Sequence, residues 1–104
     1  MSHIQTYTGK RFYPLNPMPE DIDILDIAHA LSNLCRFNGH SRRFYSVAQH
    51  SVLVSCIVPE PLALEALLHD AAEAYFADIV RPVKPHLLGL GEIEQRIHAA
   101  IAER

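Results

Sequence analysis

Apolar residues recur at spacings of three and four along most of the chain from Glu20 onward. This is the period of an amphipathic helix, in which side chains at those spacings share one face. The pattern predicts four helices, over about 22–36, 46–58, 61–77 and 91–103. The order Ser46-Val47-Ala48-Gln49 has the form of a capping box, which places the start of the second helix at Ser46.

The first 19 residues follow a different pattern. Gly9 interrupts a run rich in threonine and tyrosine, and Pro14, Pro17 and Pro19 exclude a helix there. This segment is expected to form a short hairpin or an extended arm. The sequence therefore predicts one all-α domain over residues 1–104, in which the arm (1–19) precedes a compact bundle of four to five helices (20–104).

Composition excludes several classes of function. A chain of 104 residues with 49% hydrophobic and 20% charged residues is typical of one small globular domain. The net charge of −3 argues against broad nucleic-acid binding, and no apolar run approaches the ~20 residues of a membrane span. Cys35 and Cys56 lack metal-type spacing, so we expect two reduced core thiols in a cytoplasmic protein.

The candidate chemistry lies in the second and third predicted helices, which carry His50 and the pair His69-Asp70. A short turn near Glu60 would make these helices an antiparallel hairpin. His50 lies ten residues before Glu60 and His69 nine after it, so both would lie roughly 14 Å from the turn. The sequence thus predicts that the two imidazoles meet.

His50 shares its face of the second helix with apolar residues. Those within about 60° of it are Val47, Leu53, Val54 and Ile57. An apolar stripe faces the core of a globular protein, so His50 is expected to point inward.

The third helix is apolar nearly all round and is expected to be central. On it, His69, Asp70 and Glu73 share an arc of about 100°. Burying such a cluster is costly unless its members are paired or bound to a cation. Two interpretations follow from this pattern: a divalent-metal site, or a polar network in which Asp70 and Glu73 cap loops or pair with Arg36 or Arg43.

Several stretches of the chain resemble one family. They are Ser46-Val47-Ala48-Gln49-His50-Ser51, residues 67–74, residues 78–84, and the N-terminal stretches 4–9 and 28–32. His50 followed by His69-Asp70 is similar to the opening of the H…HD…D signature of HD-domain phosphohydrolases. A Glu three residues after the HD pair, then an Asp and a proline-rich loop ending in Lys, resembles the 5′-deoxynucleotidase-like branch with its phage and bacterial members.

This resemblance implies a metal-dependent phosphohydrolase that cleaves phosphate from deoxynucleotides, as a 5′-nucleotidase or a nucleoside triphosphate phosphohydrolase. In the family pattern, His50, His69 and Asp70 bind one divalent metal ion. Glu73 would be the general acid or base, and Asp78 would help to position the attacking water. Imidazole and carboxylate ligands suit manganese, cobalt, iron, nickel or zinc.

A phosphate substrate also needs cations. Five of the nine basic residues fall in or beside the two loops next to the site: Arg36, Arg42, Arg43, Arg81 and Lys84. Among them we expect Arg36, Arg43 and Lys84 to contact the substrate. Arg36 is favoured because the resemblance places a phosphate-binding arginine at or just after the first helix. His40, in the basic loop, is a further candidate substrate contact.

One ligand of the family pattern is missing. The family closes its metal site with a distant Asp, whereas no Asp follows Asp78 in this chain. The site could bind metal with three protein ligands, take an acid from another copy, or be degenerate with weak or no catalysis. Missing downstream helices would also leave apolar surface on the second and third helices exposed, which favours a homo-oligomer. Two further functions stay open: a non-catalytic module that binds metal and nucleotide, and a helical interaction protein.

Overall fold

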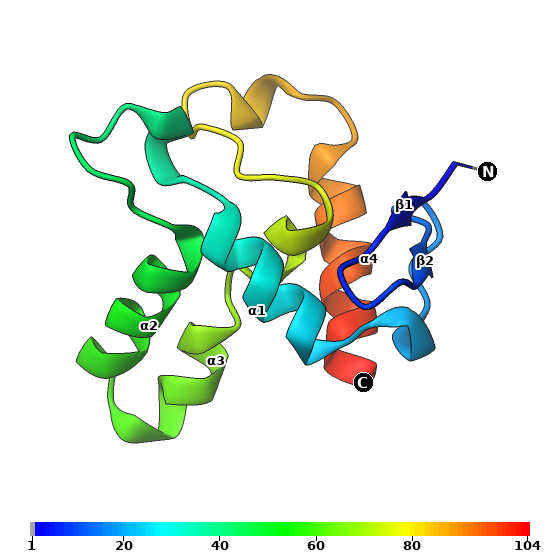
Figure 1. Ribbon diagram of the computed structural model, residues 1–104, viewed down its shortest axis with the longest axis horizontal. Coiled ribbons are helices and arrows are strands. Elements are labelled where there is room, and N and C mark those ends of the chain that lie inside the picture. Colours follow the sequence, from blue (N-terminus) through cyan, green and yellow to red (C-terminus); the bar gives the residue numbers. More distant parts are fainter. Residues whose placement is uncertain (1) are drawn as a thin grey trace.

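The structure, a computed structural model, describes residues 2–104. Within them it is all-α apart from one two-stranded hairpin, which confirms the predicted fold class (Figure 1). The α-helices are α1 (Ile24–Asn33), α2 (Val47–Ile57), α3 (Ala63–Leu67) and α4 (Leu90–Glu103). Short 3-10 turns lie between them: η1 (Pro19–Asp21), η2 (Arg36–Gly39), η3 (Glu60–Leu62), η4 (Ala71–Tyr75) and η5 (Lys84–His86).

The N-terminal arm is the hairpin. β1 (Ile4–Gln5) pairs antiparallel with β2 (Arg11–Phe12), with Ile4 opposite Phe12. Gly9 forms part of the connecting turn at a φ of 90°, a conformation that glycine adopts without strain. The prolines that follow β2 keep the chain out of a long helix until α1 begins, as the sequence predicts.

Two contacts fix this arm to the helices. The ring of Phe12 is fully buried and stacks on Tyr75 of η4, with ring centroids 4.1 Å apart. The buried carboxylate of Asp26 in α1 accepts hydrogen bonds from the backbone N–H and the hydroxyl of Thr8, at 2.7 and 2.9 Å. The arm therefore closes one side of the core.

The core lies between α1, η4 and α4. Its buried apolar residues are Phe12, Ile22, Ile27, Leu31, Val47, Ala71, Ala72, Tyr75, Ile97 and Ala100. The helix predicted over about 91–103 is confirmed as α4, in which Ile97 is fully buried while Ile93 and Ile101 pack against the cluster. On α1 the buried face carries Ile27 and Leu31, whereas Ile24 and Leu25 are exposed.

The capping box at the start of α2 is confirmed. The Ser46 hydroxyl accepts a hydrogen bond from the backbone N–H of Gln49 at 3.0 Å, and the Gln49 side chain accepts one from the backbone N–H of Ser46 at 2.8 Å. These bonds satisfy N–H groups that have no partner within the helix. Helices α2 and α3 then lie side by side as a hairpin, as the sequence predicts (Figure 1).

The prediction that the apolar faces of this α2–α3 hairpin are buried is wrong at most positions. Val47 is buried, but Leu53 and Ile57 are 56% and 80% exposed. In α3, Leu64 is 69% exposed, so this helix is peripheral and not central. Periodicity groups side chains on one face but does not supply a partner for that face, and none of residues 2–104 covers it. The exposed apolar surface that the sequence analysis expects on these two helices is present.

The third predicted helix is interrupted. The helix α3 ends at Leu67, and residues 68–70 form a turn before η4 begins at Ala71. Leu68 and Asp70 have φ/ψ of −98°/4° and −104°/13°, outside the α-helical region. The break has a packing cause: α3 packs against α2, whereas η4 packs against α1 and α4. One straight helix could not contact both sets of partners.

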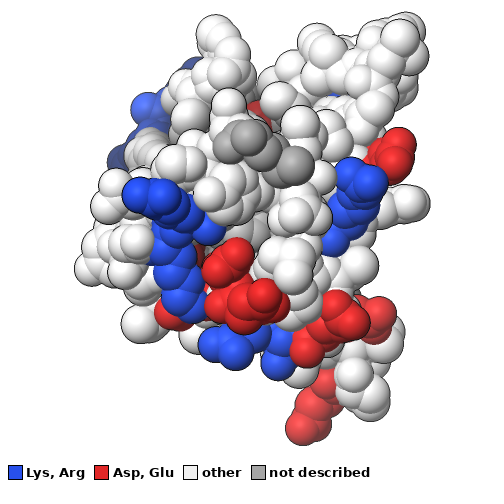
Figure 2. All heavy atoms as spheres, turned by 90° about the vertical axis from the view of Figure 1, so that its right-hand side faces the viewer, with Lys and Arg blue, Asp and Glu red and all other residues white. Residues whose placement is uncertain are grey.

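Other expectations concern the surface. Cys35 is half-buried and Cys56 is exposed, so the expected core position is wrong for Cys56, and both thiols are free. No helix in residues 2–104 has the length and apolarity needed to cross a membrane. The face formed by the arm and α4 carries acidic and basic side chains side by side (Figure 2).

Candidate metal centre

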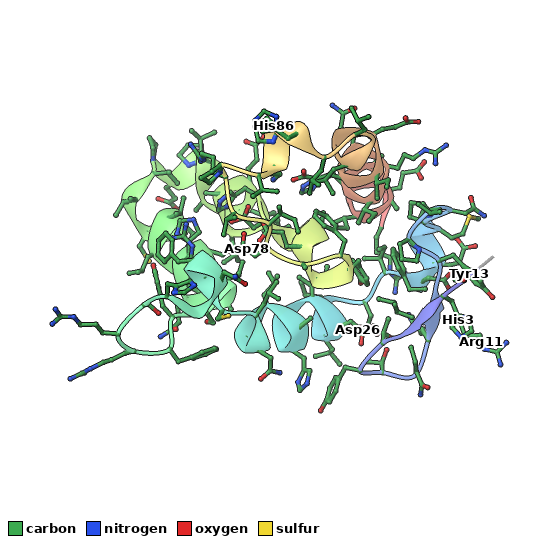
Figure 3. The ribbon with its side chains drawn as sticks, turned by 90° about the horizontal axis from the view of Figure 1, so that it is seen from above. His3, Arg11, Tyr13, Asp26, Asp78 and His86 are labelled. Atoms are coloured by element: carbon green, nitrogen blue, oxygen red, sulfur yellow. The ribbon has the colours of Figure 1, made fainter. Side chains whose placement is uncertain are left out.

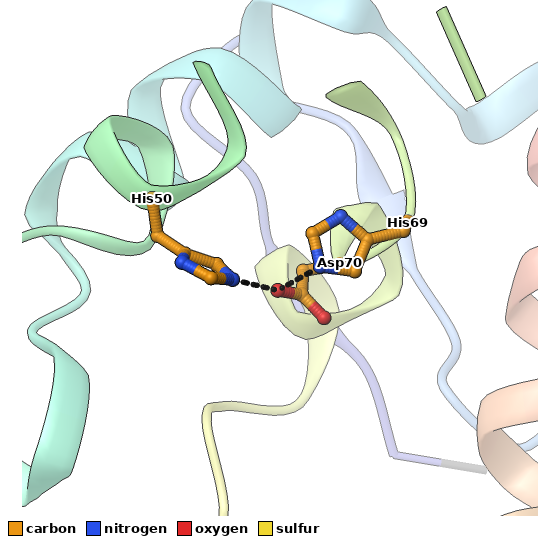
Figure 4. Close-up of side chains that lie close together, drawn as sticks. All are labelled: His50, His69 and Asp70. Carbon is orange, nitrogen blue, oxygen red and sulfur yellow. Dashed lines mark ion pairs between the residues drawn. The ribbon is translucent and has the colours of Figure 1, made fainter. Parts of the chain in front are cut away.

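Three side chains converge between α2 and the turn after α3: His50 from α2, and His69 and Asp70 from the turn (Figure 4). Asp70 Oδ2 lies 3.0 Å from His69 Nε2 and 3.8 Å from His50 Nε2. The two imidazole centroids are 5.4 Å apart, and one ligand atom from each residue lies within 4.8 Å of the others. The predicted meeting of the two histidines is confirmed.

The ring of His69 is oriented by the backbone. Its Nδ1 is hydrogen-bonded to the carbonyl oxygen of Ala66, and a carbonyl only accepts, so Nδ1 carries the proton. In the neutral ring, Nε2 then points a lone pair at Asp70 Oδ2 from 3.0 Å. Two acceptors this close repel each other unless a proton or a metal ion lies between them. This donor set therefore fits a divalent cation bound through His69 Nε2.

The ring of His50 is oriented differently. Nη1 of Arg36, in η2, lies 2.8 Å from His50 Nδ1. A guanidinium only donates, so Nδ1 accepts and the ring proton is on Nε2. Burial and then the charge of Arg36 lower the pKa of His50, although Asp70 opposes this, so the ring is neutral at neutral pH. A neutral imidazole is the form that binds metal, but here its Nε2 presents an N–H to the centre.

Glu73 lies next to Asp70 and is only 7% exposed. Burial raises the pKa of Glu73 to about 9, and the negative charge of Asp70 and a hydrogen bond with Asp70 act in the same direction. Asp78 raises this pKa further, whereas Lys84 lowers it. Glu73 is therefore a protonated carboxylic acid at neutral pH, able to donate a proton in this site.

A cavity of about 680 Å³ opens over these residues, which is a usual size for a small-molecule site. Its charged and polar lining comprises Arg36, His50, His69, Asp70, Glu73, Asp78, Arg81 and Lys84. The segment between η4 and η5, where Asp78 lies, forms one wall (Figure 3). Of the predicted substrate-binding residues, the structure thus brings Arg36 and Lys84 to the cavity, with Arg81 beside them.

The side chains of Arg36 and Lys84 are each held in place by neighbouring residues. The guanidinium carbon of Arg36 lies 4.5 Å from the ring centroid of Phe37 and 5.6 Å from that of Tyr45. Nζ of Lys84 lies 3.3 Å from the carboxylate of Glu94 in α4. Stacking and ion pairing each orient a cation while leaving further N–H donors for an anion.

His40, Arg42 and Arg43 do not line this cavity, and all three are exposed. The structure therefore gives no support to His40 and Arg43 as substrate contacts. They lie on a loop that is closed at its base by backbone hydrogen bonds. Arg36 N–H donates to the carbonyl of Tyr45, and Val47 N–H donates to that of Leu34, both at 2.8 Å.

Phe37 is a cavity residue that the sequence interpretation missed. Phe37 and Asn38 have φ values of 56° and 52°, in the left-handed region that residues other than glycine seldom occupy. The pair Asn38-Gly39 was a usable signal, because asparagine and glycine favour this conformation. The direction of the Phe37 ring has no corresponding sequence signal.

The arginine-paired network is not what the structure contains. Within residues 2–104, the ion pairs of Asp70 are with His50 and His69. Arg36 contacts an imidazole instead of a carboxylate, and Arg43 is exposed on the loop. The arrangement supplies a cation site, a proton donor and anion-binding groups within one cavity.

Comparisons with known proteins give relatives without a stated activity. The chain is 52% identical over 104 residues to "Uncharacterized protein YfdR" of Escherichia coli (strain K12), covering all of this chain and 58% of that protein. It is 40% identical to "Uncharacterized protein RCAP_rcc00048" of Rhodobacter capsulatus, over 90% of this chain and 53% of that protein. The chain thus spans a little over half the length of these relatives. No protein-family model matches it.

Proposed function

We propose that this chain is a metal-dependent phosphohydrolase of the HD-domain type that releases phosphate from deoxynucleotides. The observation that carries the proposal is the convergence of His50, His69 and Asp70 beside a protonated Glu73. A metal site alone serves many reactions, but the basic residues on the cavity wall favour a phosphate-bearing substrate. The resemblance of the signature residues to the HD family supplies the reaction class.

In this proposal His50, His69 and Asp70 hold one divalent ion, with manganese, cobalt, iron, nickel and zinc as candidates. When bound, such an ion polarises a phosphate oxygen and makes a water more acidic. Arg36 and Lys84 hold the remaining phosphate oxygens through charge-assisted hydrogen bonds.

Asp78 and Glu73 orient the water and supply the proton for the reaction. Asp78 accepts a hydrogen bond from the attacking water and orients it. The water oxygen bonds to phosphorus as the bond to the leaving oxygen breaks, and Glu73 donates its proton to that leaving oxygen. One proton of the water stays on the released phosphate, and the other restores the proton of Glu73 through solvent. The raised pKa of Glu73 keeps this proton available at neutral pH.

The test is phosphate release from a panel of deoxynucleoside mono- and triphosphates with each candidate metal. We expect His69→Ala and Glu73→Gln each to lower the rate by about 100-fold or more. His40→Ala is the matched control, because it removes an exposed histidine outside the cavity, and it should leave the rate unchanged. Full activity in His69→Ala would contradict the proposal.

A second candidate is a non-catalytic module that binds metal and nucleotide. It is favoured by the number of ligands, since the described residues bring together three metal-binding side chains. This candidate predicts that metal and a nucleotide together raise the melting temperature while no phosphate is released. Turnover that depends on Glu73 would exclude it.

We also propose that the protein is cytoplasmic and a homo-oligomer. Two free thiols, one of them exposed, favour a reducing compartment. The exposed apolar residues of the α2–α3 hairpin favour association of two copies. Sedimentation velocity that gives a monomer at micromolar concentration would contradict the second statement.

A further inference from the structure

The contact between Arg36 and His50 has a consequence for metal binding. Arg36 Nη1 donates to His50 Nδ1 at 2.8 Å, which places the ring proton on Nε2. Nε2 is the atom that faces the oxygen of Asp70, at 3.8 Å. A nitrogen that carries a proton has no lone pair for a metal ion, so this form of His50 cannot be a ligand through Nε2.

For His50 to become a ligand, the ring proton must leave Nε2 and one must be taken up at Nδ1 by exchange with water. The N–H at Nδ1 would then face the N–H of Arg36 across 2.8 Å. Two donors cannot share one hydrogen bond, and the guanidinium has no acceptor to offer. Metal binding through Nε2 and the present Arg36 contact therefore exclude each other.

Arg36 also has a second place to bind. It lines the cavity together with Arg81 and Lys84, and it keeps donors that His50 does not use. A tetrahedral oxyanion in the cavity accepts bidentate hydrogen bonds from a guanidinium, which a single imidazole nitrogen cannot do. An anion would therefore draw Arg36 away from His50.

We infer that Arg36 is a positioning residue that couples anion binding to metal binding. Arg36 releases His50 for the metal ion only when an oxyanion replaces His50 as its hydrogen-bond partner. This inference rests on the proposed metal site. Because coupling is reciprocal, the anion raises the affinity for metal by the same factor as the metal raises the affinity for anion. The protein would then bind either ligand weakly alone and both tightly together.

His69 serves as an internal reference for this mechanism. Its Nδ1 donates to the carbonyl of Ala66, so the neutral ring presents the lone pair of Nε2 toward Asp70. The neutral ring of His69 is thus already the ligating tautomer, whereas that of His50 is not. Only the His50 ring should change tautomer when metal and anion bind.

The first measurement is the ring tautomer, read from long-range ¹H–¹⁵N correlation spectra of the metal-free protein. We expect the proton on Nε2 in His50 and on Nδ1 in His69. With zinc and sulfate added, His50 should carry its proton on Nδ1, while His69 should not change. A proton already on Nδ1 of His50 in the metal-free protein would overturn the inference.

The second measurement is zinc affinity by calorimetry, with and without sulfate, at constant ionic strength. Sulfate serves as the phosphate analogue. We expect sulfate to raise zinc affinity about 10-fold in the natural protein. In Arg36→Met, zinc should bind tightly without sulfate, and the effect of sulfate should fall to about twofold or less.

Arg81→Met is the matched control, because it removes an equal charge from the same cavity without touching His50. Charge alone would give both variants the same coupling, and that result would overturn the inference while leaving the metal site intact. Absence of zinc binding in every variant would overturn the metal site itself, and with it the proposed function.

Discussion

The two sides of this molecule differ in how far their apolar residues are buried. On one side the arm, α1, η4 and α4 pack together, and Phe12, Ala71 and Ile97 are fully buried. On the other side the α2–α3 hairpin leaves Ile57 and Leu64 80% and 69% exposed. Both sides have helical periodicity, so the difference lies in whether a partner element is present.

The candidate metal centre lies where these two sides meet. Asp70 directly precedes the buried η4, so the packed side holds it firmly. His50 projects from α2, whose outer face has no cover within residues 2–104. The residues of one site are thus held with unequal rigidity, and the predictions below test that contrast.

The largest change in the free energy of unfolding should come from a substitution on the packed side. Ile97→Ala removes a fully buried side chain and should lower the free energy of unfolding by about 3 kcal/mol, because it loses apolar burial and leaves a cavity. Ile57→Ala makes the same chemical change at an exposed position and should cost about 0.5 kcal/mol or less. Urea unfolding of both variants measures the contrast, and equal losses would refute it.

A bound metal ion should link the packed side to the α2–α3 hairpin, because it would join Asp70 to His50. With sulfate present to release His50 from Arg36, zinc at about 100 times its Kd should add ~2.7 kcal/mol to the free energy of unfolding, since it binds only the folded chain. His50→Ala should remove this gain, while His40→Ala should keep it. Thermal melts with and without zinc are the measurement, and a gain that survives His50→Ala would show that the ion binds elsewhere.

The buried acid should make the packed side sensitive to pH. The pKa of Glu73 is about 9 in the folded chain against an ordinary value of 4.5. The folded state therefore holds the proton more tightly, so the stabilisation is complete below about pH 4.5 and is lost as the pH rises toward 9. In chelator, stability should fall between about pH 5 and pH 8 by at least the ~1.4 kcal/mol that one pKa unit represents.

Glu73→Gln is the control for this pH dependence, because an amide has nearly the same shape and does not ionise. Its urea unfolding midpoint should change much less over the same range. Parallel curves for the two proteins would assign the dependence to other groups.

A smaller effect should come from the start of α2. A helix with little burial depends more on its ends, so Ser46→Ala should cost about 1 kcal/mol through loss of the capping box. Ser46→Asp, which keeps an acceptor at this position, should recover part of that loss. Amide hydrogen exchange should show faster exchange in α2 for Ser46→Ala, and a uniform change over the whole chain would contradict a local effect.

The smallest effect on stability should come from Leu64→Gln. Leu64 is mostly exposed, so the free energy of unfolding should change by about 0.5 kcal/mol or less. Self-association through this face should weaken measurably in sedimentation velocity. A large loss of stability in the dissociated protein would mean that Leu64 is buried after all.

Sequence alone predicted those features that local chemistry determines. The capping box of Ser46 and Gln49 and the stripe around Ile97 follow from residue type and spacing. The meeting of His50 and His69 was predicted by counting residues on either side of Glu60. The prediction holds although α3 ends before His69, because the two histidines still lie at similar distances from the turn.

The remaining features depend on partners that spacing does not reveal. The break at residues 68–70 arises because α3 and η4 pack on different elements. The proton position on His50 depends on Arg36, which approaches from η2, 14 residues away. The pKa of Glu73 depends on burial beside Asp70 and Asp78, and a helical arc cannot give that burial.

The loop that follows Arg36 has fixed ends and a free tip. Backbone hydrogen bonds join Arg36 to Tyr45 and Val47 to Leu34, so both ends stay in place whatever happens between them. Doubling the length of a closed loop costs only about 0.6 kcal/mol in chain entropy. Evolution or an engineer could therefore exchange the residues around His40 and Arg43 for longer or different ones, and so vary what approaches the cavity, without moving Arg36 or His50.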